Sequence, residues 1–408
     1  MWILCIGLAT NKSFRSFFHS RAFRQVQPIY LAIAASTILH ILAEVGSFSS
    51  HSVPNSRNFF NAMSHDLIKI FLVPTVFLTG FLIFSDRSAQ HVRNGSRFIG
   101  ILFLVHFAYL IAQRNLGIDW VRGFGSVLGP HRYAYGVYRL SGFMSHPLTL
   151  AYNLMLLTFL CLGIGLFAKT GKNYWFIGSG LVSAASIALS GSRWPFFCLS
   201  VGLVLWSIRA WRPRPKIILA GFFAAAAALV LEGSLWSRTL ELVSALKSGD
   251  FNGHIPRLSF WQAHWKIFIE NPLFGLGSSG LPFHRMAYFH SIGYNGPIDT
   301  AHNIFLQALA ESGIIGLFRL GITFVGIAIG IRNLENKQFQ LCGYTLLLLT
   351  VLAGLTQNVL WDSEYVLCFW VSIGVLFALD NIQKPNAVTS PGDHARHDPA
   401  AMLLRPSS

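Results

Sequence analysis

The sequence predicts an all-α fold, a polytopic bundle of transmembrane helices, from three observations. Of 408 residues, 53% are hydrophobic and 12% are charged, whereas a soluble domain carries about a quarter charged residues. Apolar stretches that approach the roughly 20 residues of a membrane-crossing helix recur along the chain. These stretches are continuously apolar and do not alternate with polar residues, which argues against a β-barrel.

Ten apolar stretches are predicted to cross the membrane, although several are short for a full crossing. The remaining chain is polar, and its longest polar segment lies between the seventh and eighth stretches. The predicted spans are residues 28–45, 67–84, 98–113, 147–168, 174–190, 195–208, 216–232, 313–331, 341–357 and 364–380.

The Lys and Arg residues predict the orientation of these spans. They concentrate in alternate short connections, and such connections face the cytoplasm. Both ends of the chain are then cytoplasmic, while Arg193, residues 114–146 and residues 233–312 face outward. The net charge of +15 is explained by this pattern, so we expect no nucleic-acid partner.

The predicted organisation is a single transmembrane helical domain over residues 1–380. It includes a long outward loop, about 233–312, that carries most of the candidate catalytic residues. Residues 381–408 are polar and contain several prolines, which indicates a disordered cytoplasmic tail.

Arg193 lies in the connection between the fifth and sixth predicted spans, in the sequence Ser190-Gly-Ser-Arg193-Trp-Pro195. Ionisable groups at a membrane boundary are costly and often functional. The alternative is an arginine that anchors a helix end among lipid headgroups.

Arg257 opens a predicted amphipathic helix that begins after Pro256 and ends at Asn271-Pro272. Trp261 and His264 follow it at i+4 and i+7, and the tryptophans suit a membrane interface. Arg257 either binds substrate or meets lipid phosphate as part of a plain interfacial helix.

His302 stands where this polar segment becomes apolar again, with Asn303 beside it and Thr300 as a predicted helix N-cap. A neutral imidazole can accept a proton from a sugar hydroxyl near pH 7. The alternative is a structural histidine.

Metal and nucleotide sites find no support in the sequence. His284, His290 and His302 lack an HExxH pattern, Glu44 is a lone carboxylate, and no Asp-x-Asp occurs in the outward segments. The stretch Gly275-Leu-Gly-Ser-Ser-Gly280 has no P-loop lysine. We therefore expect no metal and no cofactor.

The remaining candidates are cations: Arg193 and Arg257, with Arg139 as a further one, beside His302. Guanidinium groups bind phosphate oxygens bidentately and stay charged. They would stabilise the negative charge that develops on a diphosphate leaving group. This set suits transfer of a group from a membrane-bound diphosphate at the outer surface.

These residues resemble the O-antigen ligase and polymerase superfamily of bacterial inner-membrane proteins. The resemblance covers about residues 139–316. Its motifs are Arg139-Leu-Ser-Gly-Phe-Met-Ser-His-Pro147, Ser190-Gly-Ser-Arg193, Arg257 with Trp261, Asn271-Pro-Leu-Phe-Gly-Leu-Gly277, His302-Asn-Ile-Phe-Leu306 and Glu311-Ser-Gly313.

The resemblance implies a GT-C-like, multi-pass inner-membrane protein of about 10–12 spans whose active site faces the periplasm. It implies a metal-independent glycosyltransferase that passes an undecaprenyl-diphosphate-linked glycan to lipid A-core, with inversion at the sugar carbon. Arg193 and Arg257 would hold the donor diphosphate, and His302 would act as base or position the acceptor. Arg139, His146 and Asn303 are the candidate substrate-binding residues.

The same superfamily contains O-antigen and exopolysaccharide polymerases, which extend the lipid-linked glycan instead. Ligase and polymerase differ in their acceptor, lipid A-core or a growing glycan, and one sequence leaves this choice open. A transporter of lipid-linked sugars is a third hypothesis. It would need mid-membrane charges and broken helices, whereas Lys69 and Arg319 are expected near span ends.

Overall fold

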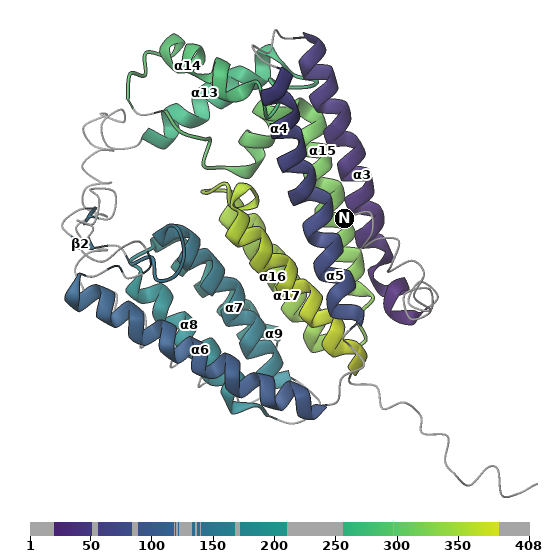
Figure 1. Ribbon diagram of the computed structural model, residues 1–408, viewed down its shortest axis with the longest axis vertical. Helices are drawn as coiled ribbons and strands as arrows, with labels where there is room; N and C mark the ends of the chain where they lie inside the picture. The colour runs from purple at the N-terminus through teal and green to yellow at the C-terminus, as the bar shows by residue number, and fades with distance from the viewer. Residues whose placement is uncertain are drawn as a thin grey trace, which may run out of the picture.

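The described residues of the protein are helical apart from short connections, and this confirms the predicted all-α bundle (Figure 1). The computed structural model describes residues 20–50, 56–83, 89–117, 119, 121, 133–134, 137–138, 140–167, 172–209, 256–296 and 298–382. Its helices are α3 (Arg21–Ser50), α4 (Ser56–Leu67), the π-helix η1 (Ile68–Leu72), α5 (Val73–Ile83), α6 (Ala89–Leu116), α7 (Pro147–Phe167), α8 (Tyr174–Leu189), α9 (Arg193–Arg209), α13 (Pro256–Glu270), α14 (Leu281–Ser291), α15 (Ile304–Arg332), α16 (Lys337–Gly354), the 3-10 helix η4 (Val359–Trp361) and α17 (Ser363–Ile382). A two-residue antiparallel pair joins β1 (Tyr133–Ala134) and β2 (Val137–Tyr138).

Each predicted span overlaps one of these helices, or α4, η1 and α5 together for the stretch 67–84. The exception is the stretch 216–232, which lies outside the described residues. Within the described part of the chain, 6 helices are long and apolar enough to cross a membrane, and α8 and most of α9 are shorter apolar helices. The predicted tail from residue 383 onward and residues 233–255 of the predicted loop also lie outside the described residues.

Helix α3 shows why this bundle belongs in a membrane. Its polar residues Ser36, His40, Glu44 and Ser47 recur every three or four positions and are all buried. The opposite face carries exposed large apolar side chains, as with Leu31, which is 63% exposed. A helix that turns polar groups inward and hydrocarbon outward is stable only where the surroundings are apolar.

The helices form two groups that meet along α16 and α17 (Figure 1). One group contains α3, α4, α5 and α15, and the other contains α6 to α9. Large buried side chains fill the contact between them; those exposed by less than 2% include Phe159, Trp206, Phe339 and Phe377. Helices α13 and α14 lie across one end of the bundle, over the start of α15 (Figure 1).

Helix α15 begins at Ile304, within the predicted loop of about 233–312, and is interrupted by non-helical backbone at Gly313. Arg319 was expected near a span end, yet it lies in the middle of α15 and is buried. The first turns of α15 are apolar apart from Gln307, Glu311 and Ser312, and these three polar residues are buried against protein.

Candidate active site

His302 immediately precedes α15 and has an unusual backbone. Its φ of 48° is the one positive value at a residue other than glycine in the described chain. Both neighbours fix this conformation: the Ala301 amide donates to Gln307 Oε1 (3.0 Å), and Asn303 caps α15. Strained backbone of this kind persists only where surrounding contacts enforce it, and it is common at functional sites.

The imidazole of His302 makes two hydrogen bonds. Nδ1 lies 2.9 Å from Gln357 Oε1, and Nε2 lies 3.1 Å from Asp299 Oδ2. The ring also stacks at a tilt on Phe260 of α13, with 5.8 Å between the ring centroids. These contacts hold the ring against α13 on one side and the end of α16 on the other.

Arg257, in the first turn of α13, lies close enough to Tyr152 of α7 for its charge to act on the Tyr152 hydroxyl. That hydroxyl shares a hydrogen bond of 3.1 Å with Thr356 Oγ1. Thr356 is the residue before Gln357, the partner of His302. Arg257, in α13, and His302, before α15, therefore both lie near the same short turn.

Arg193 is the first residue of α9 and is half-buried. Gly191 has a φ of 63° in the turn that separates α8 from α9, which only glycine adopts readily. The next side chain, Trp194, donates its indole N–H to the Leu352 carbonyl at 2.8 Å. This bond places the start of α9 beside the last turn of α16.

The end of α16 is thus the point on which the candidate residues converge. The segment Leu352–Gln357 receives contacts from Trp194, Tyr152, His302 and Asn303. We call this segment, together with Arg193, Arg257 and His302, the α16-end site. Two arginines and one histidine that are remote in sequence belong to this site.

Asn303 and His146 have local structural partners at helix starts. Asn303 accepts from the Phe305 and Leu306 amides and donates to the Leu355 carbonyl at 3.1 Å. It is the N-cap of α15, so the prediction that Thr300 caps this helix is wrong. His146 Nδ1 accepts from the Leu148 amide at 3.1 Å at the start of α7. Direct substrate contacts of both residues stay predictions, and Arg139 lies outside the described residues.

The segment Asn271–Gly277 and the interruption in α15 form one structure. The amides of Leu276 and Gly277 donate to the carbonyls of Ala310 and Glu311, at 2.9 and 2.7 Å. In return, the Ile314 amide donates to the Pro272 carbonyl at 2.8 Å. The segment therefore satisfies the backbone groups that the interruption leaves unpaired, as a broken helix inside a membrane requires.

Behind the α16-end site lies a buried polar network around Glu311. Gln307 Nε2 donates to its carboxylate at 2.6 Å, and the Trp361 indole N–H does so at 3.0 Å. Asn358 donates to Gln307, and Gln307 in turn accepts from the amide beside His302. The network connects the interruption in α15 to the backbone of His302.

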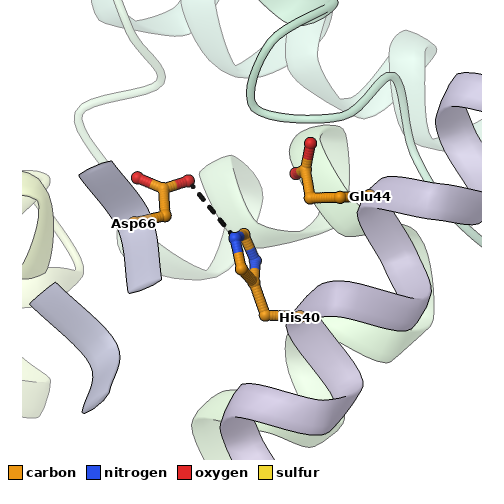
Figure 2. Close-up of side chains that lie close together, drawn as sticks. All are labelled: His40, Glu44 and Asp66. Carbon is orange, nitrogen blue, oxygen red and sulfur yellow. Dashed lines mark ion pairs between the residues drawn. The ribbon is translucent and has the colours of Figure 1, made fainter. Parts of the chain in front are cut away.

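A second cluster, His40, Glu44 and Asp66, brings side chains of α3 and α4 together (Figure 2). Their ligand atoms lie within 4.8 Å of one another. Glu44 was expected to be a lone carboxylate, and this expectation is wrong. The pairing was not visible in the sequence because Asp66 comes from a different helix.

The chemistry of this cluster fits an ion-pair network better than a metal site. Arg319 donates to His40 Nδ1, so the ring's remaining proton is on Nε2, which faces Asp66 at 3.6 Å. An imidazole in this state presents no lone pair to an ion. On the same side, Lys69 donates to the Trp361 carbonyl at 2.6 Å. Buried cations and carboxylates here compensate one another.

The three histidines weighed as metal ligands are not part of that cluster. His290 Nδ1 pairs with Asn295 Oδ1 at 3.2 Å, and His302 pairs with Asp299 and Gln357. Among the described residues, neither His284, His290 nor His302 belongs to a group of three possible ligands.

Several residues of the site were not among the sequence candidates. Asp299 precedes His302 by three positions, and this spacing was the available signal, since a carboxylate near a candidate base often orients it. Gln357 and Tyr152 are 55 and 150 positions from His302 along the chain, and no sequence pattern links them to it.

Comparison with known proteins agrees with the motifs. Residues 178–321 match the family described as O-antigen ligase, a range that includes Arg193, Arg257 and His302. A protein of Rickettsia conorii, provisionally named a polysaccharide ligase, is 30% identical over 139 residues. The match covers 32% of this chain and 33% of that relative, so the chain matches about a third of the relative's length.

These matches confirm the resemblance predicted from the motifs around Arg193, Arg257 and His302. Over residues 178–321, the chain is similar to the O-antigen ligase family.

Proposed function

We propose that the protein is a metal-independent glycosyltransferase of the O-antigen ligase type. It transfers a glycan from undecaprenyl diphosphate to lipid A-core at the periplasmic face of the bacterial inner membrane. The observation that carries this proposal is the α16-end site, where Arg193, Arg257 and His302 converge from three separate parts of the chain.

Arg193 and Arg257 supply the charge that this chemistry needs. When the bond between the sugar and the diphosphate breaks, negative charge accumulates on the leaving phosphate. Guanidinium groups stabilise that charge at any relevant pH, which is the task a metal ion performs in other transferases. The position of Arg193 at the start of α9 adds the partial positive charge of a helix N-terminus.

The ligase function is preferred to a polymerase because both comparisons name ligases. Transport is not favoured, although the broken α15 and the buried Arg319 are features of transporters. The cavity beside Arg319, Lys69 and Asp66 has a volume of about 90 Å³, which is too small to pass an oligosaccharide. Its charged side chains are also held by protein partners.

The test is a deletion strain complemented with the wild type or with Arg193→Ala, Arg257→Ala or His302→Ala, examined by lipopolysaccharide gel. We expect bare core with polymer still on the lipid carrier in the deletion, and restoration by the wild type only. Immunoblotting of membranes shows that the variants are present.

Other gel patterns contradict the ligase assignment. Core carrying a single repeat unit indicates a polymerase, and a normal ladder in the deletion strain indicates neither activity. Full activity in a membrane-resident variant removes that residue from the mechanism.

A further inference from the structure

The structure places a carboxylate, Asp299, beside His302 in the segment that precedes α15. Asp299 Oδ2 lies 3.1 Å from His302 Nε2, and its Oδ1 accepts from the Thr300 amide at 2.7 Å. The Asp299 side chain is 56% exposed, whereas that of His302 is 18% exposed. An approaching sugar hydroxyl therefore reaches the carboxylate more readily than the ring.

Neither nitrogen of His302 has a free lone pair in this arrangement. An ionised carboxylate only accepts hydrogen bonds, so Nε2 carries a proton and donates it to Asp299. Nδ1 lies 2.9 Å from Gln357 Oε1, and with the Gln357 amide in this orientation Nδ1 is a donor too. Turning the Gln357 amide round would make Nδ1 an acceptor, but that lone pair would then be occupied by the amide N–H.

The carboxylate of Asp299, by contrast, keeps accepting capacity. Each of its oxygens has two lone pairs, and the described contacts occupy one on each. Such a group can receive a further hydroxyl proton without breaking any bond that the protein makes.

The charges around Asp299 keep it ionised. His302 donates to it from its own segment, Arg285 acts on it from α14, and His264 faces it from α13. The hydrogen bond from His302 is the largest influence and holds the pKa of Asp299 at about 2. Burial lowers the pKa of His264 to about 4, so that ring adds no charge near pH 7. Asp299 is thus an available proton acceptor over the whole physiological pH range.

We propose that Asp299 is the catalytic base of the transfer, and that His302 is a positioning residue that orients the carboxylate. The acceptor hydroxyl oxygen forms a bond to the sugar carbon while the bond from that carbon to the diphosphate oxygen breaks. The hydroxyl proton passes to Asp299, and the lipid diphosphate leaves with the electron pair. This inference rests on the proposed function, since it assigns a role within that reaction.

A carboxylate of low basicity suffices for this step. The hydroxyl becomes strongly acidic only as its oxygen bonds to the carbon, so the proton moves late. Inverting glycoside hydrolases use a carboxylate in the same way to activate water.

The test compares purified full-length wild type, Asp299→Asn, Asp299→Glu and Asp299→Ala in transfer from a lipid diphosphate-linked glycan. Asparagine keeps the shape and one acceptor oxygen but cannot take the proton. We expect a kcat at least 100-fold lower for Asp299→Asn with an unchanged donor KM, in line with the usual contribution of a general base. Asp299→Glu keeps the carboxylate and retains measurable transfer. Glu270→Gln, which removes an exposed carboxylate at the end of α13, is the matched control with wild-type rates.

Two readouts separate a base from a purely structural carboxylate. Formate supplies an external carboxylate and should partly restore Asp299→Ala. The second readout is the split between kcat and the donor KM. Loss of a base lowers kcat alone, whereas loss of a structural carboxylate also raises the donor KM.

Other results overturn the inference. Asp299→Asn within threefold of wild type removes Asp299 as the base. Equal loss in the Asn, Glu and Ala variants, without formate rescue and with a raised donor KM, shows a structural role only. An inactive wild type contradicts the proposed function itself, and this outcome is recognised before any variant is compared.

Discussion

At the scale of single residues, several separate contacts fix the position of His302. Its left-handed backbone, its two ring hydrogen bonds and the Asn303 cap all come from different partners. Sequence reasoning identified His302 and Asn303 but assigned the cap to Thr300. A hydroxyl and a side-chain amide are both good caps, and only the backbone turn at His302 decides between them.

Asn303→Ala should lower both stability and transfer. The cap contributes about 1 kcal/mol to stability, and its loss also releases the backbone that fixes His302. The matched control is Asn336→Ala, which removes the N-cap of α16 far along the chain from the site. Thermal unfolding in detergent should show similar losses for both variants, with transfer reduced only in Asn303→Ala. Equal transfer rates in both would contradict the link between this cap and His302.

His264 predicts a pH dependence of stability. Its ring is buried on α13, and burial lowers its pKa to about 4. The unfolded chain binds a proton near the ordinary value of about 6.5, so unfolding is favoured as pH falls from there to 4. The contribution reaches up to about 3 kcal/mol by linkage. The melting temperature should rise between pH 4 and 6.5, and His264→Gln should flatten this rise. An unchanged slope in that variant would show that other groups cause it.

At the scale of elements, the broken helix α15 explains why two distant motifs occur together. Gly313 has φ 59° and ψ −150°, and a Cβ there would lie 2.4 Å from Leu273 backbone atoms. Gly275 approaches the Glu311 backbone equally closely. The glycines of the two motifs therefore let one backbone pack against another. Their spacing suggested a turn, but the contact between them could not be predicted because nearly 40 residues separate the segments.

Gly313→Ala should destabilise the protein, because alanine rarely adopts this backbone conformation and its Cβ meets the Pro272-Leu273 backbone. We expect a cost of about 1–3 kcal/mol from the backbone strain alone. Gly321→Ala is the control in the same helix, where an added Cβ meets nothing within 4 Å and alanine gains about 1 kcal/mol in helix propensity. Melting temperatures that move in opposite directions support the account. Unchanged melting temperatures in both variants would show that the interruption at Gly313 tolerates a side chain.

At the scale of the whole molecule, hydropathy predicted the bundle and most of its helices, because lipid imposes continuous apolar faces. The buried charges could not be predicted in the same way. Arg319, His40 and Asp66 meet through side chains of three helices, and their pairing depends on packing. The convergence of Arg193, Arg257 and His302 on the end of α16 likewise required the fold, although each residue was a candidate in the sequence.

Transfer should be independent of divalent metals, because guanidinium groups supply the positive charge. In addition, Arg319 donates to His40 Nδ1, so this nitrogen is not open to a metal ion. EDTA treatment of the purified protein, followed by dialysis, should leave the transfer rate unchanged. Loss of the rate with recovery on adding Mg²⁺, Mn²⁺ or Zn²⁺ would contradict metal independence.

The most direct measurement of the central claim is transfer by the purified protein, from an undecaprenyl-diphosphate-linked glycan to lipid A-core, with wild type and Arg257→Gln compared. Glutamine keeps hydrogen bonding but removes the charge. We expect product with the wild type in the presence of EDTA, and at least a 100-fold lower rate for Arg257→Gln. Wild-type rates in that variant would contradict the role of Arg257, and no product from the wild type with any acceptor glycan would contradict the transferase function.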